Sequence, residues 1–439
     1  MYTPRGSFGR DLQTADLSGG GPFLDRARTE RAREREGSSR LALGAYLVVR
    51  VAHGALPDGR TDAAGSDAAA LRWQLDGALR YVEALPAEEA ERAHLHALVA
   101  ALAPVTDEGA APEARAGGHA ALRRALGAYA GFLEEDGRVS EALEIVTLAE
   151  RVRGDVPLAE ETLPLALTAG RLHALQMHWE EALAAYRRAA EAAAEAGDGA
   201  ASLQAWLGQA GVLRGQGRRA EARAEIEAVV QEAGLLERCD LAARAYTELA
   251  ALHAEEGRTV ASLQALYQAV VRTDDPARRG AMLAELARGL RELGAWDGAR
   301  AACELVLALG ARGELRLAAH LELLLVEAGA GDQVAFERQR QAVRALAHWM
   351  TPELVLEERW RVVQGLARFE QPGRAREALR EAMALAEAHR LPEWYFRLEQ
   401  CAEALAERAA PAPPAAPPAD PAALQLAQRV RAYAAALVA

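Results

Sequence analysis

Residues 170–189 read GRLHALQMHWEEALAAYRRA, and the spacing of their small residues predicts two antiparallel helices joined at a tight turn. Gly170 lies seven positions before the turn residue Met177, and Ala182 and Ala189 lie five and twelve positions after it. Small side chains at these positions let the two helices approach closely where they cross, while larger residues between them fill the space to a neighbour. The stretch therefore predicts one helical hairpin.

The same pattern recurs along the chain at a nearly constant period. The turn residues are Gly137, Met177, Gly217, Gly257, Gly294, Gly331 and Gly373, with spacings of 40, 40, 40, 37, 37 and 42 residues. Five positions after them stand Ala142, Ala182, Ala222, Ser262, Ala299, Phe336 and Ala378. Twelve positions after them stand Ala149, Ala189, Val229, Ala269, Val306, Val343 and Leu385. A fixed period of this length indicates stacked repeats, because one hairpin cannot cover its own apolar face. We predict an all-α solenoid.

These residues resemble the tetratricopeptide-repeat (TPR) family, whose pattern has a bulky residue, a small residue, a turn Gly, an aromatic residue, Ala, an aromatic residue and Ala. The match is best in two units, around Met177 (Gly170, Trp179, Ala182, Tyr186, Ala189) and around Gly294 (Leu283, Ala287, Trp296, Ala299). The period exceeds the family's usual length of about 34 residues and is similar to the longer variant found in bacterial regulatory proteins and in adaptors. The resemblance covers about residues 119–400. It implies a right-handed superhelix whose concave groove binds a protein or peptide.

The sequence departs from the family pattern in several units. Met177 replaces the turn Gly, and Phe336 stands at a position where the family has a small residue. Leu385 stands where the family has its final Ala, which requires wider packing there. The unit around Gly331 departs most, and we expect a kink or an irregular packing in it.

The composition excludes several classes of function. The 439 residues contain no Lys and no Asn, and all 51 basic residues are Arg, as expected of a GC-rich genome. Without Lys the chain has no phosphate-loop lysine and no Schiff-base lysine. The net charge of −12 argues against non-specific nucleic-acid binding. Residues 1–21 lack the pattern of a signal peptide and no apolar run reaches membrane-spanning length, so we expect a cytoplasmic protein without membrane contact.

No set of residues has the spacing of a catalytic or metal site. Three cysteines are far apart along the chain: Cys239, Cys303 and Cys401. They suggest neither a disulfide framework nor a zinc site. His94 and His96 are two residues apart and His173 and His178 are five apart, whereas helical metal ligands are three or four apart. We predict no catalytic residue, no cofactor and no metal, and therefore not an enzyme.

The residues before the repeats are expected to form two segments. Residues 1–38 are predicted to be a disordered leader, because the Arg/Glu run from Arg26 to Arg35 has no apolar face. Residues 39–115 are predicted to be an N-terminal helical segment, followed by the repeat solenoid at 116–408. Within this segment we expect three helices and then a loop: Leu41–His53, Asp67–Leu85, Glu88–Leu102 and the loop Pro104–Gly118.

The residues after the repeats also divide into two segments. Residues 409–421 form a Pro/Ala-rich linker, which is expected to be extended. Residues 422–439 carry apolar residues at four-, three- and four-residue steps: Leu426, Val430, Tyr433 and Leu437. This spacing predicts an amphipathic helix. It either docks on its own solenoid or serves as a tethered recognition helix for another protein.

Arginines are enriched on the predicted inner face of the solenoid. In TPR folds the first helix of each hairpin lines the concave surface, through positions 13, 10, 6, 3 and 2 before the turn. In the five best units these 25 positions contain Arg124, Arg171, Arg214, Arg244, Arg288 and Arg291, where composition predicts about three arginines. Because guanidinium groups pair with carboxylates, we predict an acidic segment or a C-terminal carboxylate as the ligand. The alternative is that these are surface arginines without a ligand.

The prediction for function is a non-catalytic scaffold or adaptor that binds a protein or peptide in the groove. The alternative is a ligand- or peptide-responsive regulator. The sequence shows neither a DNA-binding helix-turn-helix nor an NTPase domain, so such a regulator would act through a separate output partner.

Overall fold

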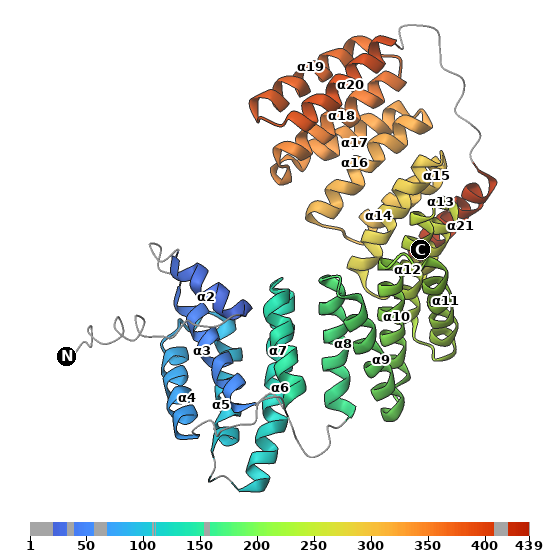
Figure 1. The fold of residues 1–439 in the computed structure, drawn as a ribbon. Helices are drawn as coiled ribbons and strands as arrows, with labels where there is room; N and C mark the ends of the chain where they lie inside the picture. Colours follow the sequence, from blue (N-terminus) through green and yellow to red (C-terminus); the bar gives the residue numbers. More distant parts are fainter. Residues whose placement is uncertain are drawn as a thin grey trace. The chain divides into compact units, whose positions relative to one another are not determined.

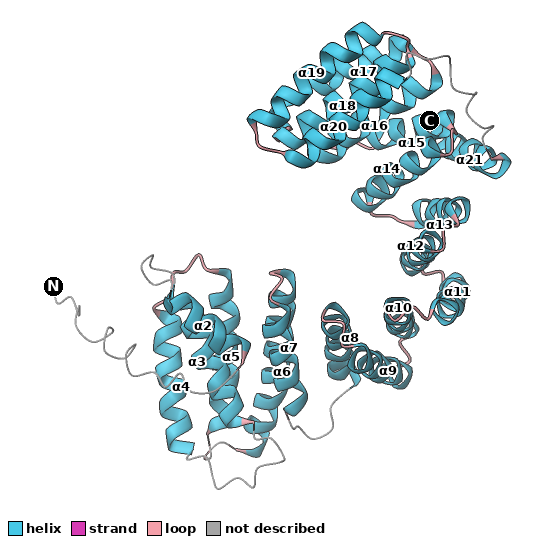
Figure 2. Cartoon of the chain, turned by 45° about the horizontal axis from the view of Figure 1, so that its top comes forward, coloured by secondary structure: helices cyan, strands magenta, loops and turns pink. Residues whose placement is uncertain are grey.

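The fold is seen in a computed structural model, which describes residues 21–32, 39–56, 68–107, 109, 111–152, 159–407 and 420–438 (Figure 1). Within these ranges every regular element is a helix, and Figure 2 shows the chain as successive helices joined by short loops. The predicted all-α fold of stacked hairpins is confirmed. The chain forms two compact units, Met1–Glu225 and Ile226–Ala439. None of the described helices is both long and apolar enough to cross a lipid bilayer.

The first unit begins with four helices: α2 (Pro22–Ala32), α3 (Ser39–Ala55), α4 (Ala68–Glu83) and α5 (Ala90–Thr106). The prediction of a disordered leader over residues 1–38 is wrong for 22–32, which form α2. Phe23, Leu24 and Ala27 are buried in the core of this unit, where α2 packs mainly on α3, and the ring of Phe23 lies 6.1 Å from that of Tyr129. The Arg/Glu run alone gives no sign of that core. Residues 1–20 and 33–38 lie outside the described residues.

The predicted loop at 104–118 is also wrong. Helix α5 continues through Pro104 to Thr106, and α6 (Pro112–Glu135) begins at Pro112. Proline suits the first position of a helix, because its missing N–H has no partner there. Gly118 lies within α6, and a Cβ atom at this residue would be 2.8 Å from Cγ of Pro104. The glycine therefore allows close helix packing rather than marking a loop.

The hairpins of the first unit follow in order. Their helices are α6, α7 (Val139–Arg151), α8 (Ala159–Leu175), α9 (Trp179–Ala196) and α10 (Gly199–Gly215). The turns at Gly137, Met177 and Gly217 all have positive φ, at 74°, 58° and 76°. Helix α11 (Arg219–Leu235) contains the boundary between the two units.

In the described part of the second unit, four hairpins are followed by two further helices. Its elements are α12 (Cys239–Glu255), α13 (Thr259–Arg272), α14 (Pro276–Glu292), α15 (Trp296–Ala308), α16 (Gly313–Ala330), α17 (Gln333–Ala345), the 3-10 turn η2 (Ala347–Trp349), α18 (Pro352–Arg368), α19 (Pro372–Ala388), α20 (Pro392–Glu407) and α21 (Pro421–Val438). Residues 408–419, most of the predicted linker, lie outside the described residues.

The turn of the α18–α19 hairpin is three residues earlier than predicted. Gly373 lies inside α19, and the residue with left-handed φ is Glu370, at 55°. Measured from Gly331, the period is then 39 rather than 42 residues. The residues five and twelve positions after this turn are Ala375 and Ala382, and both are fully buried. This unit therefore keeps the small residues of the repeat, although a glutamate occupies its turn.

The bulky Phe336 is accommodated by a glycine in the next hairpin. Phe336 is fully buried, and a Cβ atom at Gly365 on α18 would lie 2.3 Å from its ring. The ring also packs edge-on against Phe369, with centroids 5.3 Å apart. Helix α17 is followed by the 3-10 turn η2, and it packs mainly on α16 with little contact to α18, so the irregular packing expected of this unit is present.

Candidate functional site

The six predicted arginines all lie on first helices of hairpins, but in two different units. The first unit contains Arg124 on α6, Arg171 on α8 and Arg214 on α10. The second contains Arg244 on α12 and Arg288 and Arg291 on α14. The structure therefore does not gather the six residues into one site, and each unit is considered separately.

Arginines of the first unit are largely engaged within the chain. Arg171 binds Glu134 of α6 through two parallel hydrogen bonds, Nε to Oε1 at 2.8 Å and Nη2 to Oε2 at 2.9 Å. The hydrogen bonds that Arg171 donates to Glu134 raise the pKa of Arg171. Arg214 also has a partner within the chain. Arg171 thus links two successive first helices, which is a structural role, and among these three only Arg124 has no bonded partner in the described residues.

Arg291 of the second unit is likewise committed to a carboxylate of the chain. Its Nε donates to Glu322 of α16, and its Nη2 lies 3.2 Å from Glu292. Glu322 is only 6% exposed and also accepts from Arg361 of α18 at 2.9 Å. This buried carboxylate therefore holds three successive first helices together through two guanidinium groups.

Arg244 and Arg288 remain available to a ligand. Both side chains are exposed, and neither forms a hydrogen bond or ion pair with any residue in the described part of the chain. Their helices meet at Thr247 of α12, whose Oγ1 lies 3.7 Å from Sδ of Met282 on α14. The solvent-facing residues between the two arginines are small. We define the α12–α14 arginine face as Arg244, Thr247, Ala251, Ala281, Ala284 and Arg288.

Acidic residues lie one turn from each arginine of this face, Asp240 and Glu248 beside Arg244 and Glu285 and Glu292 beside Arg288. Asp240 lies one turn before Arg244, but it accepts two hydrogen bonds from Arg238, at 3.0 and 3.1 Å. The hydrogen bond from Arg238 lowers the pKa of Asp240, so this carboxylate stays ionised and paired. Glu285 is exposed on α14 one turn from Arg288. The six residues of the face itself carry two positive charges and no negative charge, in a chain whose net charge is −12.

A second cluster on first helices was not predicted. The guanidinium carbon of Arg397 on α20 lies 4.2 Å from the ring centroid of Trp360 on α18 and 5.0 Å from that of Trp394. Phe396, next to Arg397, is 62% exposed. The signal in the sequence was three consecutive aromatic residues at 394–396, in a chain where aromatics make up 5%. Trp and Arg are enriched at protein-binding hot spots.

Catalytic and metal-binding chemistry finds little support among the described residues. No three His, Cys, Asp or Glu side chains in this part of the chain are placed to hold a metal ion. The rings of His173 and His178 are 5.9 Å apart, and burial lowers the pKa of His173. Cys303 is buried, and burial raises the pKa of its thiol. A buried thiol of this kind is unreactive.

No model of a known protein family matches the chain, and no curated protein matches it. Among solved structures, a Rap protein complexed with competence and sporulation factor is 12% identical, covers 84% of this chain and 98% of its own, and has a TM-score of 0.40. The Rap conjugation gene regulator of plasmid pLS20, in complex with a Phr peptide, is 13% identical, with coverage of 79% and 97% and a TM-score of 0.39.

Proposed function

We propose that this protein is a non-catalytic binding protein that holds an acidic segment of a partner protein or peptide against the α12–α14 arginine face. The observation that carries the proposal is the exposure of Arg244 and Arg288, on two successive first helices, without a bonded partner in the described residues. Arg171 and Arg291, by contrast, are bound to carboxylates of the chain itself.

The geometry of the face suggests the spacing of acidic residues in the ligand. Arg244 lies three residues before Thr247 on α12, and Arg288 lies six residues after Met282 on α14. Because successive first helices run in the same direction, the two arginines are about 13 Å apart along the helix axes and about 10 Å apart across them, which gives about 16 Å in a straight line. An extended peptide covers this distance in about five residues. We therefore propose two carboxylates about five residues apart in an extended segment.

The α12–α14 arginine face combines small side chains with two guanidinium groups. Ala251, Ala281 and Ala284 leave room for a peptide backbone to approach the helices. A guanidinium group binds a carboxylate through two parallel hydrogen bonds, and such charge-assisted bonds contribute about 1.5–3 kcal/mol each when shielded from water. Exposed pairs contribute less, about 0.2–1 kcal/mol, and are screened by salt. Binding is therefore expected to weaken as the salt concentration rises.

The test is peptide binding to the full chain and to two charge-matched variants. Fluorescently labelled extended peptides with two Glu residues at spacings of two to six are titrated with protein, and affinity is measured by anisotropy. Arg244→Glu combined with Arg288→Glu should weaken binding of the best peptide at least tenfold. The control combines Arg376→Glu with Arg380→Glu, two exposed arginines of α19 in the same unit, and makes the same change in net charge.

The comparison of the two variants decides the proposal. If only the first variant loses affinity, the arginine face is the binding site. Equal loss in both variants would mean that the peptide responds only to net charge. No loss in either would remove the arginine face as the site, and in either case the proposal is wrong.

A further inference from the structure

The last helix of the chain packs on second helices rather than on first helices. Helix α21 contacts α15 and α13, the second helices of two successive hairpins in the second unit (Figure 1). Its buried residues form one stripe, at steps of three, one and three residues: Ala423, Leu426, Ala427 and Val430. They belong to the same hydrophobic core as α13, α14 and α15. The surface under α21 is therefore apolar and would be exposed without it.

Gly298 of α15 makes this surface specific for a helix with small residues. A Cβ atom at Gly298 would lie 2.5 Å from Cβ and 2.6 Å from Cα of Ala427. Glycine weakens a helix interior relative to alanine, so its presence within α15 has a structural reason, the close approach of α21. The residues at the same position after the other turns all carry a Cβ atom: Glu141, Glu181, Glu221, Ala261, Ala335 and Arg374.

The charges of the two surfaces are complementary. Residues 421–438 contain Arg429 and Arg431 and no acidic residue. The facing edge of α15 carries Asp297 and Glu304, both exposed, and Nη1 of Arg431 lies 3.9 Å from Oδ2 of Asp297. The ring of Tyr433 packs edge-on against Tyr267 of α13, with centroids 6.2 Å apart. A basic amphipathic helix is therefore the chemistry that this surface fits.

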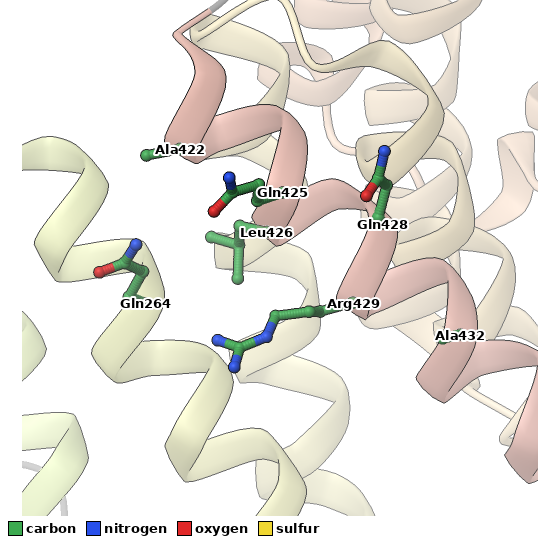
Figure 3. Close-up of a pocket in the computed structure, with 7 residues that line it drawn as sticks. All are labelled: Gln264, Ala422, Gln425, Leu426, Gln428, Arg429 and Ala432. Atoms are coloured by element: carbon green, nitrogen blue, oxygen red, sulfur yellow. The ribbon is translucent and has the colours of Figure 1, made fainter.

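Helix α21 does not fill the surface on which it lies. A hollow of about 490 Å³ separates it from α13, and Figure 3 shows Gln425 and Arg429 of α21 facing Gln264 of α13 around this space. A second hollow of about 640 Å³ lies along α15, beside Glu304 and Arg431. The fully buried part of the contact is thus one narrow stripe of four residues, with Tyr433 and Ala434 packed at its edge. In the sequence, thirteen residues, five of them Pro, separate α20 from α21.

We propose that the surface of α13 and α15 around Gly298, which we call the α13–α15 seat (Gln264, Tyr267, Asp297, Gly298, Ala301 and Glu304), is a docking site for a basic amphipathic helix of a partner protein. Helix α21 occupies the seat in cis and competes with that partner. The partner helix carries small residues four positions apart, as Ala423 and Ala427 do, and aliphatic residues at the positions of Leu426 and Val430. The seat is separate from the α12–α14 arginine face, which lies on first helices and attracts acidic ligands.

The test uses the full chain and a labelled synthetic peptide of residues 420–439 as the probe. Val430→Asp places a carboxylate at a fully buried position of α21 and should release the helix while leaving the seat intact. The peptide should bind this variant, and it should bind the wild-type chain at least tenfold more weakly, because a tether of this length supplies the competing helix at an effective concentration of about 1 mM. A peptide of the same composition in scrambled order should not bind.

A second substitution identifies the place of binding. Adding Gly298→Leu to the Val430→Asp chain should reduce peptide affinity at least tenfold. Gly298→Ala in the same chain should reduce the affinity by a smaller factor, although alanine favours the helical state of α15. Arg244→Glu with Arg288→Glu should leave peptide binding unchanged, so failure of the arginine-face proposal is distinguishable from failure of this one. Unchanged hydrogen exchange of α14 shows that each variant keeps its fold.

Three results would overturn the proposal. The first is no binding of the peptide to the Val430→Asp chain at concentrations up to about 1 mM. The second is binding that is indifferent to Gly298→Leu. The third is a wild-type dimer in sedimentation that dissociates on Gly298→Leu, because the occupant of the seat would then be α21 of a second copy rather than a helix of a different partner.

Discussion

Glu91 is the residue on which we base the most detailed prediction. It lies on α5, is 3% exposed, and accepts hydrogen bonds from Arg26 of α2 at 3.1–3.3 Å and from Tyr129 of α6 at 2.6 Å. Arg138, at the α6–α7 turn, forms an ion pair with the same carboxylate at 2.9 Å. One carboxylate therefore joins three parts of the first unit, and Glu91→Gln removes its charge with little change in size.

The expected cost of Glu91→Gln is about 3 kcal/mol. Removing one partner of a buried ion pair costs about 3–5 kcal/mol, because the remaining charge stays buried without compensation. The lower end applies here, since Glu141 remains near both guanidinium groups, 3.6 Å from Arg26 and hydrogen-bonded to Arg138. Tyr129→Phe removes one hydrogen bond to a charged acceptor and should cost about 1.5–3 kcal/mol. The double variant should cost less than the sum, because both changes affect one interaction.

The effect of Glu91→Gln should depend on pH. Burial alone would raise the pKa of Glu91, but the hydrogen bonds from Arg26 and Tyr129 and the positive charges of Arg26 and Arg138 lower it below the ordinary value of 4.5. A carboxyl group whose pKa is lower in the folded state stabilises the fold above the unfolded-state pKa. That stabilisation is lost as the pH falls through the folded-state pKa. The difference between wild type and variant should therefore be full at pH 7 and shrink below about pH 4.5.

Two measurements check this prediction. Hydrogen exchange of residues 22–32 should accelerate in the Glu91→Gln chain at pH 7, because α2 is attached to α5 through Arg26. Urea unfolding at pH 7 and pH 4 gives the pH dependence of the stability difference. Glu113→Gln, at an exposed position of α6, is the control and should change neither. The reasoning is refuted if α2 keeps its protection in the Glu91→Gln chain, or if the stability difference is the same at both pH values.

Further predictions concern the second unit. Glu370→Gly should stabilise it by about 1 kcal/mol in thermal unfolding, because glycine adopts left-handed φ without steric cost. Gly373→Ala should also stabilise it by up to about 1 kcal/mol, and destabilisation would place the turn at Gly373 instead. Phe336→Ala should lower the free energy of unfolding in urea by about 3–5 kcal/mol. Gly365→Ala should also lower it in the wild type, but by less in the Phe336→Ala chain, because the added methyl group then no longer meets the Phe336 ring. Burial raises the pKa of Glu358, so the ionised form of this side chain opposes folding at pH 7. Glu358→Gln should therefore raise the urea midpoint at pH 7. The gain should vanish near pH 4, where the glutamic acid of the wild type is neutral like the glutamine of the variant.

The helical hairpins and most of their turns could be predicted from the sequence alone. Glycine adopts the left-handed conformation without steric cost, so Gly137, Gly217 and Gly257 could be predicted as the turns of their hairpins, and all three have positive φ. The alanines five and twelve positions later, such as Ala182 and Ala189, are fully buried as expected. These signals are local, because turn geometry and the crossing of two helices depend on residues that lie within about twenty positions of each other.

Other features were decided only by tertiary contacts. Glu370 takes the turn conformation in place of Gly373, because the buried positions of Ala375 and Ala382 set the register of the hairpin. Phe23 orders α2 through a core built from α3 and more distant helices.

The candidate site also combines features that the sequence predicts with features that only tertiary contacts decide. The repeat spacing placed all six arginines on first helices, but it could not separate those that bind carboxylates of the chain from those that face solvent unpaired. Arg171 binds Glu134, which lies 37 residues away in the sequence, and Arg291 binds Glu322, which lies 31 residues away. Likewise, the stripe of α21 predicted an amphipathic helix, whereas its place on α15 depends on the missing side chain of Gly298. A periodic pattern determines which face a residue occupies, and only the packed structure determines what it meets there.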